Sequence, residues 1–163
     1  MNAITSLDQM VQHLIQTGLN KRIAVAVAED ENTIGALIEA KEKGFATPIL
    51  IGNKSKIRDV LAGANAKAED YKIIDVPDHL LAAKEAVRMV RMEEADVLMK
   101  GLIGTDKFLK AVLDKEKGLL PPKAVMSYVC AIELPKYNKL LFVSDTAVLP
   151  YPDLNQKIAM VNY

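Results

Sequence analysis

Hydrophobic residues along this chain fall into two kinds of segment, short apolar runs and longer stretches with helical spacing. The short runs have the length of strands that are buried on both faces of a parallel sheet, at 22–28, 47–52, 72–76 and 96–100. Stretches with helical spacing follow them at 33–43, 54–61, 78–94 and 105–113. Strand–helix units in succession predict an α/β fold whose parallel sheet is wound with right-handed crossovers. A further helix is expected over 6–18, before the first strand.

The pattern changes at 118–122, where two consecutive prolines prevent a helix from continuing. Two apolar segments follow at 124–134 and 139–143, separated by a loop too short for a crossover helix, so we expect an antiparallel pair. A last helix is expected after Asp153, and no stop signal closes it before Tyr163. We therefore predict a first α/β domain at 1–120 and the truncated start of a second α/β domain at 121–163.

Composition narrows the class of protein. A chain of 163 residues with 50% hydrophobic and 26% charged residues is typical of a globular domain. Lysine plus arginine equal aspartate plus glutamate at 21 each, which argues against a nucleic-acid or membrane-surface partner. The single cysteine, Cys130, excludes an internal disulfide, and neither a signal peptide nor a membrane-length apolar run is present. We expect a soluble, cytoplasmic protein.

Candidate chemistry lies just beyond the predicted strands, because ligands of open α/β sheets bind at the carboxyl ends of the strands. Lys100 ends one apolar run, Gly101 permits close backbone approach, and Thr105 stands at a predicted helix N-terminus suited to phosphate. The same residues are also explained as a solvated strand end, a turn and an ordinary cap, and spacing alone favours that explanation. The segment is neither a Walker A loop nor a dinucleotide fingerprint.

Two further polar residues are candidates of the same kind. Asp145 follows an apolar run and could hold a hydroxyl, an amide or a metal-bound water, or could simply close a turn. Ser127 could place a hydroxyl in a cleft, although a lone serine in a strand is more often packed. Neither His13 nor His79 lies near a serine or cysteine nucleophile, and no cluster has the spacing of a metal site.

Three ordered segments resemble the phosphate acetyl/butyryltransferase family, and the butyryl branch fits better than the acetyl branch. The first is the Met-Lys-Gly…Thr…Leu segment within 95–113. The second is the Asp-containing strand end at 140–147 with the proline-led helix start at 152–157, and the third is the strand at 47–52. The similarity covers about 21–163, nearly the whole chain.

The resemblance implies reversible transfer of an acyl group between coenzyme A and inorganic phosphate, with coenzyme A as a substrate and no other cofactor or metal. It implies a three-layer parallel-sheet fold of the isocitrate/isopropylmalate dehydrogenase-like type, and homo-oligomers that are generally dimers. By motif, Lys100, Gly101 and Thr105 would line the phosphate or acyl-phosphate side of the cleft. Ser127 and Asp145 would lie nearby.

Members of that family are considerably longer than this chain. Their C-terminal half supplies a serine, an arginine and an aspartate for coenzyme A binding and catalysis, so we expect the catalytic residues outside this sequence and predict that the chain alone is inactive. A non-catalytic module that binds a phosphorylated metabolite is the main alternative. A phosphate acyltransferase of lipid synthesis or a hydroxythreonine phosphate dehydrogenase would share the fold, but the latter needs a metal-ligand set that the sequence lacks.

Overall fold

A computed structural model describes residues 3–146 and 148–162 of the chain, which form two compact units. The first, here called the sheet unit, comprises Gly18–Leu119. The second, here called the hairpin unit, joins the described residues up to Thr17 with those from Leu120 onward. The domain limits expected from the sequence, 1–120 and 121–163, stay a prediction.

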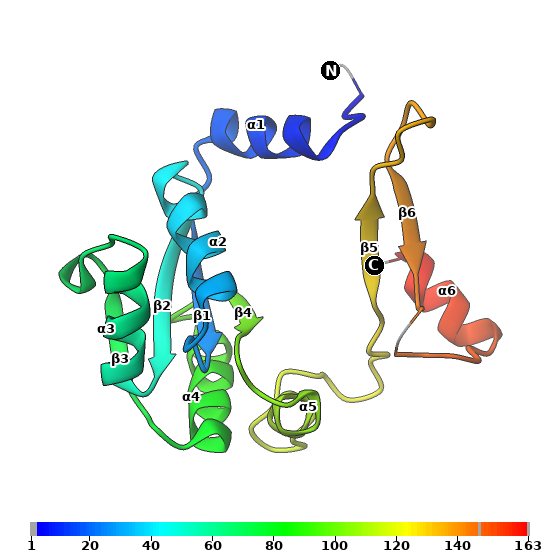
Figure 1. Ribbon diagram of the computed structural model, residues 1–163. Helices are drawn as coiled ribbons and strands as arrows, with labels where there is room; N and C mark the ends of the chain where they lie inside the picture. Colours follow the sequence, from blue (N-terminus) through cyan, green and yellow to red (C-terminus); the bar gives the residue numbers. More distant parts are fainter. Residues whose placement is uncertain (1–2, 147, 163) are drawn as a thin grey trace. The chain divides into compact units, whose positions relative to one another are not determined.

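The sheet unit contains a four-stranded parallel sheet in the order β3-β2-β1-β4, which confirms the α/β class (Figure 1). Its strands are β1 (Lys21–Ala26), β2 (Ala46–Gly52), β3 (Lys72–Asp75) and β4 (Val97–Lys100). Its helices are α2 (Glu31–Glu42), α3 (Lys54–Gly63), α4 (His79–Arg91) and α5 (Thr105–Val112), with a short 3-10 helix at Ala68–Asp70. Each predicted strand–helix unit is present, with boundaries that differ by a few residues.

Two hydrophobic cores, one on each face of the sheet, make this unit a three-layer structure. On one face, Ile34 and Leu37 of α2 and Ile57 and Leu61 of α3 pack against alternate residues of β1 and β2. On the other face, α4 contributes mainly small side chains, which let the helix lie close to the strands, and Ala111 of α5 joins the same cluster. Both faces of β1 are therefore covered, as its continuous apolar run predicts.

Side-chain caps fix the starts of three helices of the sheet unit. Asp30, Asn53 and Asp78 each accept a hydrogen bond from the backbone N–H three residues ahead, which satisfies one free amide of the first turn. The cap at Asp30 was not expected from the sequence. Because Asp30 caps α2, the helix begins at Glu31 and not at the expected Thr33.

The hairpin unit contains α1 (Leu7–Thr17), the antiparallel strands β5 (Val129–Ile132) and β6 (Leu141–Ser144), and α6 (Leu154–Asn162). The antiparallel pair was expected, although its strands are shorter than the apolar segments that predicted them. Asp153 begins α6 by a reciprocal pair of hydrogen bonds with Gln156, each 2.8 Å. No described residue of this unit is a buried hydrophobic, since that core lies within residues 24–111.

Candidate functional site

The strand order defines where a ligand would be expected. From β1 the chain proceeds outward to β2 and β3, then returns to place β4 on the opposite side of β1. The carboxyl ends of β1 and β4 therefore flank the topological switch point, where the crossovers diverge and open α/β sheets bind ligands. In the β1–β4 register Ala26 is opposite Lys100. The segment from Lys100 to Thr105, selected from the sequence, thus leaves the sheet at its switch point.

Gly101 lies directly against the backbone of β1. Its N–H donates to the carbonyl oxygen of Ala26 at 2.9 Å, and the N–H of Leu102 donates to that of Val27 at 2.7 Å. A Cβ atom on Gly101 would lie 2.3 Å from the oxygen of Val27 and 2.9 Å from its carbonyl carbon. Close approach to the neighbouring strand is therefore what requires a glycine at this position.

Val27 has a left-handed backbone conformation, with φ of 60°. This conformation is strained for a β-branched residue and persists only where the surroundings enforce it. Val27 is fully buried, and its carbonyl oxygen accepts the N–H of Leu102. The change of backbone conformation ends β1 at Ala26, two residues before the predicted end, and turns the carbonyl of Val27 toward the segment after β4.

The N-terminus of α5 differs from those of α2, α3 and α4. Its N-cap residue is Gly104, and no side chain makes a capping hydrogen bond there. The amides of the first turn therefore remain available to a ligand at the positive end of the helix dipole. Lys100 brings an ammonium group to the same segment, with Nζ 3.3 Å from the carbonyl oxygen of Gly101. Asp106 opposes this positive character, since one of its carboxylate oxygens would lie 2.5 Å from a Cβ on Gly104.

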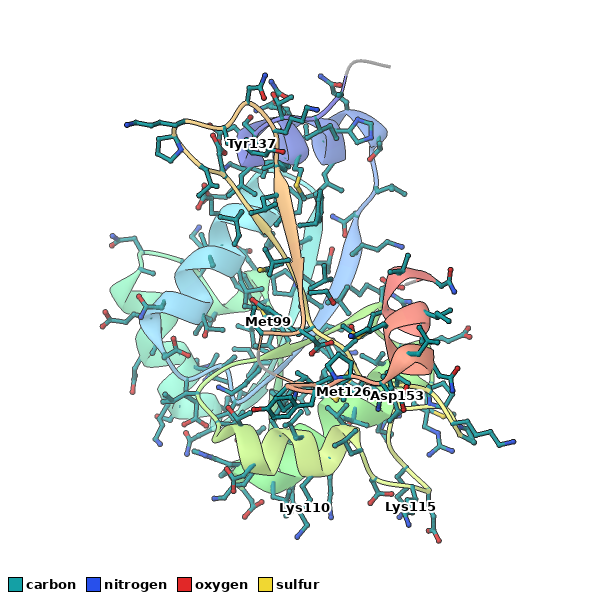
Figure 2. All side chains as sticks on the ribbon, turned by 90° about the vertical axis from the view of Figure 1, so that its right-hand side faces the viewer. Met99, Lys110, Lys115, Met126, Tyr137 and Asp153 are labelled. Carbon is teal, nitrogen blue, oxygen red and sulfur yellow. The ribbon has the colours of Figure 1, made fainter. Side chains whose placement is uncertain are left out.

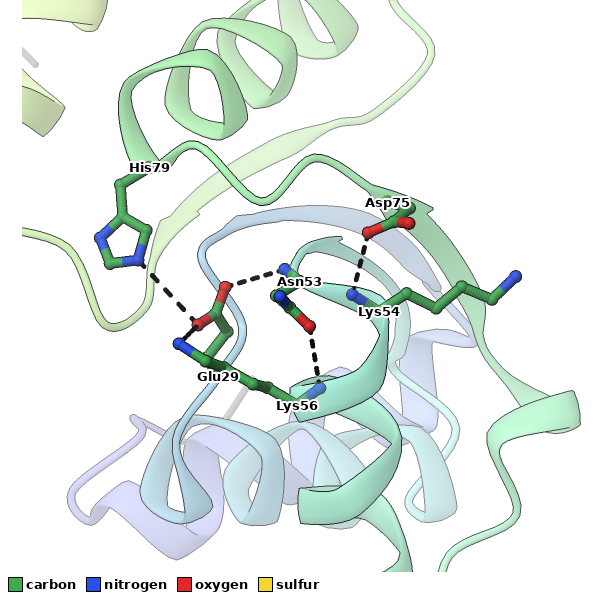
Figure 3. Close-up of polar contacts among 6 residues, drawn as sticks. All are labelled: Glu29, Asn53, Lys54, Lys56, Asp75 and His79. Carbon is green, nitrogen blue, oxygen red and sulfur yellow. Dashed lines mark hydrogen bonds and ion pairs between the residues drawn. The ribbon is translucent and has the colours of Figure 1, made fainter.

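A second polar arrangement surrounds Glu29, just beyond β1 (Figure 3). The Glu29 side chain is only 1% exposed. Its Oε1 accepts the backbone N–H of Asn53 at 2.8 Å, and its Oε2 lies 3.1 Å from Nζ of Lys56 and 4.0 Å from Nε2 of His79. One carboxylate thereby connects the segments that follow β1, β2 and β3. Beside it, Asp75 accepts the backbone N–H of Lys54 at 3.0 Å.

Glu29 lies just beyond a predicted strand, where candidate chemistry was expected, but no role was predicted for it from the sequence. The sequence did contain an indication of this cluster, because an acidic residue follows directly after a strand that is buried on both faces. A carboxylate in that position is buried only if hydrogen-bond donors surround it. Gly52 adds a second signal, since its φ is +155° and a Cβ there would lie 2.9 Å from Oε1 of Glu29. The Glu29 cluster thus requires both the acid and the glycine opposite it.

Ser127 and Asp145 belong to the hairpin unit, where the structure brings them together. Asp145 closes a turn: it adopts a φ of 50° and its carboxylate accepts the N–H groups of Leu149 at 2.8 Å and Tyr128 at 3.3 Å. Partial burial acts to raise the pKa of Asp145, but these backbone donors and the Ser127 hydroxyl outweigh it and lower the pKa overall. Lys100, Gly101 and Thr105 are neighbours in the sheet unit.

Metal ligation and membrane insertion find no support in the parts of the chain that the structure describes. No three histidine, cysteine, aspartate or glutamate side chains are grouped there to hold a metal ion. None of the helices within residues 3–146 and 148–162 combines the length and apolarity needed to cross a membrane.

The sheet, its switch point and the uncapped helix N-terminus beside a lysine define a class of α/β protein with a candidate anion site at the carboxyl edge of the sheet. The chain belongs to the family described as "Phosphate acetyl/butaryl transferase", whose pattern matches residues 6–86 and 78–163. It is 39% identical over 157 residues to the phosphate butyryltransferase of Clostridium beijerinckii, covering 96% of this chain and 51% of that protein. It is 41% identical over 142 residues to the enzyme of the same name from Clostridium acetobutylicum, covering 87% of this chain and 47% of that protein.

A solved structure supports the same fold. The branched-chain phosphotransacylase from Enterococcus faecalis V583 superposes with a TM-score of 0.70 at 23% identity, over 87% of this chain and 49% of that one. The family resemblance expected from the sequence is confirmed by these comparisons. The chain spans about half the length of the curated relatives it matches.

Proposed function

We propose that this chain forms the phosphate-binding part of an acyltransferase that moves a short acyl group between coenzyme A and inorganic phosphate. The observation that carries this proposal is the position of the Lys100–Thr105 segment at the switch point of the sheet, because this segment contains both an ammonium group and an uncapped helix N-terminus. Membership of the phosphate acyltransferase family supplies the reaction class.

The reaction explains why a positively charged site for phosphate is needed. The thiolate sulfur of coenzyme A attacks the carbonyl carbon of the acyl phosphate, the C–S bond forms, and the C–O bond to phosphate breaks. Inorganic phosphate leaves with the electron pair, so negative charge builds up on its oxygens. Lys100 and the first amides of α5 would stabilise that charge as fixed positive groups. Gly101 keeps the backbone of this segment close to β1, and the Thr105 hydroxyl can donate one more hydrogen bond.

Several finer features belong to the same proposal. The acyl group is butyryl or of similar size, because butyryltransferases are among the similar proteins. The complete enzyme has the isocitrate/isopropylmalate dehydrogenase-like fold, works as a cytoplasmic homo-oligomer, and uses Ser127 and Asp145 near the substrate. The thiol proton is accepted by a residue outside these 163, so this chain binds phosphate compounds but does not turn them over.

Titration calorimetry tests the binding part of this proposal, using inorganic phosphate, butyryl phosphate and coenzyme A with the 163-residue chain. We expect Lys100→Ala to weaken butyryl phosphate binding about tenfold, the loss of one charge-assisted contact. Lys110→Ala is the matched control, since Lys110 is an exposed lysine on the neighbouring α5 helix and points away from the fold (Figure 2).

An assay of acyl-CoA formation from butyryl phosphate tests the catalytic part of the proposal. In the calorimetry, equal affinities of the wild type and Lys100→Ala would contradict the assignment of the phosphate site. Rapid turnover by the chain alone would contradict the need for further residues. Binding that never leads to turnover, even in a longer protein containing this chain, would favour the non-catalytic module.

A further inference from the structure

Lys100 is an exposed residue at the end of β4. Among the residues that the structure describes, its Nζ forms no ion pair, and its one hydrogen bond is to the carbonyl oxygen of Gly101 at 3.3 Å. The N–H of Ile103 donates to the same oxygen at 2.9 Å. Nζ therefore lies beside the loop that leads into the N-terminus of α5, where the phosphate group of the proposed substrate would bind.

Two other lysines of the sheet unit have their ammonium groups bound to carboxylates. Nζ of Lys43 lies 2.6 Å from Oε1 of Glu39, and Nζ of Lys56 lies 3.1 Å from Oε2 of Glu29. A lysine nitrogen attacks an electrophile only when its electron pair is free, so each of these ion pairs must open first. The nitrogen of Lys100 has no such ion pair to open, in contrast to that of Lys56 at the same edge of the sheet.

We propose that a bound acyl phosphate acylates Lys100, an inference that rests on the phosphate site proposed above. In an acyl phosphate a single oxygen separates phosphorus from the carbonyl carbon, so a phosphate group bound at Lys100 brings that carbon next to Nζ. Holding two reactants together in this way makes their reaction much faster than that of the same groups free in solution. Acylation of Lys100 therefore depends on prior binding, whereas acylation of other exposed lysines depends on chance collision.

The acyl group is transferred from phosphate to nitrogen. The neutral amine of Lys100 attacks the carbonyl carbon with its electron pair, so that a C–N bond forms and the C–O bond to phosphate breaks. Phosphate leaves with the electrons of that bond, and the proton displaced from nitrogen passes to water. The amide product is uncharged, so the modified chain lacks the ammonium group that would hold phosphate. Acylation thus switches off the site that promotes it.

Mass spectrometry of the chain incubated with butyryl phosphate measures this reaction at each lysine. We expect the initial rate at Lys100 to exceed that at Lys110 at least about tenfold, because only Lys100 holds the reagent. The rate at Lys100 should saturate at the concentrations where calorimetry shows butyryl phosphate to bind, and inorganic phosphate should suppress it by competition. The rate at Lys110, an exposed lysine that points away from the fold, should rise linearly with butyryl phosphate and stay unchanged by inorganic phosphate (Figure 2).

Lys100→Arg separates the charge of this residue from its reactivity, because a guanidinium stays protonated and has no free electron pair for the attack. The variant should bind butyryl phosphate within about threefold of the wild-type affinity, and incubation with butyryl phosphate should leave that affinity unchanged. The wild-type chain acylated at Lys100 should instead bind about tenfold more weakly, as expected for Lys100→Ala.

Equal rates at Lys100 and Lys110, a rate at Lys100 that does not saturate, or faster acylation of another lysine would each overturn the proposal. Calorimetry distinguishes these outcomes from a failure of the phosphate site itself. If Lys100→Ala weakens butyryl phosphate binding but Lys100 reacts no faster than Lys110, the phosphate site stands and only the acylation is wrong. If Lys100→Ala binds as the wild type does, both are wrong.

Discussion

Replacing Gly101 by alanine is the substitution for which the structure gives the sharpest expectation. The added Cβ would lie 2.3 Å from the carbonyl oxygen of Val27, 2.9 Å from its carbonyl carbon and 3.0 Å from the oxygen of Ala26. Ordinary contacts are 3.4–4 Å. All three atoms are backbone atoms of β1 and of its end, so no side-chain rotation can relieve the overlap.

The expected loss of stability follows from the backbone segments that must move apart. Separating the segment after β4 from β1 by about 1 Å is overpacking, which costs roughly 1–3 kcal/mol. It also weakens the two hydrogen bonds that Gly101 and Leu102 donate to Ala26 and Val27, each contributing about 1 kcal/mol. Alanine restricts the unfolded chain and returns roughly 0.4–1 kcal/mol. We therefore expect Gly101→Ala to lower the free energy of unfolding by about 2–3 kcal/mol.

Urea denaturation of the chain measures this value, and Gly35→Ala is the matched control. Gly35 lies within α2, and a Cβ there would meet nothing within 4 Å. The same chemical change should then stabilise the protein by roughly 0.5–1 kcal/mol, because alanine favours the helix interior. The two variants should differ in sign. A Gly101→Ala variant as stable as the wild type would refute the close approach of the β4 loop to β1.

Three other predictions concern carboxylate side chains of the sheet unit. Glu29→Ala should lower the free energy of unfolding in urea by about 1–3 kcal/mol, because the partly buried amide of Asn53 loses its acceptor. Glu29→Gln keeps an acceptor oxygen and should cost less than half as much. Hydrogen bonds from the side chain and backbone of Arg22 lower the pKa of Asp96 below its ordinary 3.8. The ionised Asp96 side chain therefore contributes fully to stability above about pH 4, and this contribution is lost as the pH falls further. Asp96→Asn should weaken the dependence of the free energy of unfolding in urea on pH between about 2 and 4. Asp106→Asn should tighten phosphate binding about threefold in calorimetry by removing a negative charge from the first turn of α5, and an unchanged affinity would place phosphate elsewhere.

The sheet was predictable because its strands are continuous apolar runs and its helices have regular spacing. Neither pattern specifies which strands are neighbours, so the return of β4 to the side of β1 came only from the structure. The predicted end of β1 was wrong because the backbone conformation of a single residue decides it. The left-handed conformation of Val27 shortens β1, and no composition rule predicts it for a valine.

The candidate site was predictable only in part, for a similar reason. Lys100, Gly101 and Thr105 are close in sequence, so one local pattern suggested all three. Glu29 and its partners come from the segments after three different strands, and only the sheet register brings them together. Ser127 and Asp145 could be related as neighbours only through the β5–β6 pairing, which aligns Val129 with Ser144.

The two arrangements at the carboxyl edge of the sheet differ in whether their hydrogen bonds are already made. Glu29 is buried and surrounded by an amide and an ammonium group, so it has little capacity for a ligand and instead holds the segments after β1 and β2 in place. The N-terminus of α5 has the opposite character, because Gly104 offers no capping side chain and leaves its first amides free. Side chains cap α2, α3 and α4, whereas none caps α5 at the switch point of the sheet, and this contrast supports the proposed phosphate site. The Glu29 cluster, with its partners after β2 and β3, and the proposed phosphate site after β4 therefore lie on opposite sides of β1.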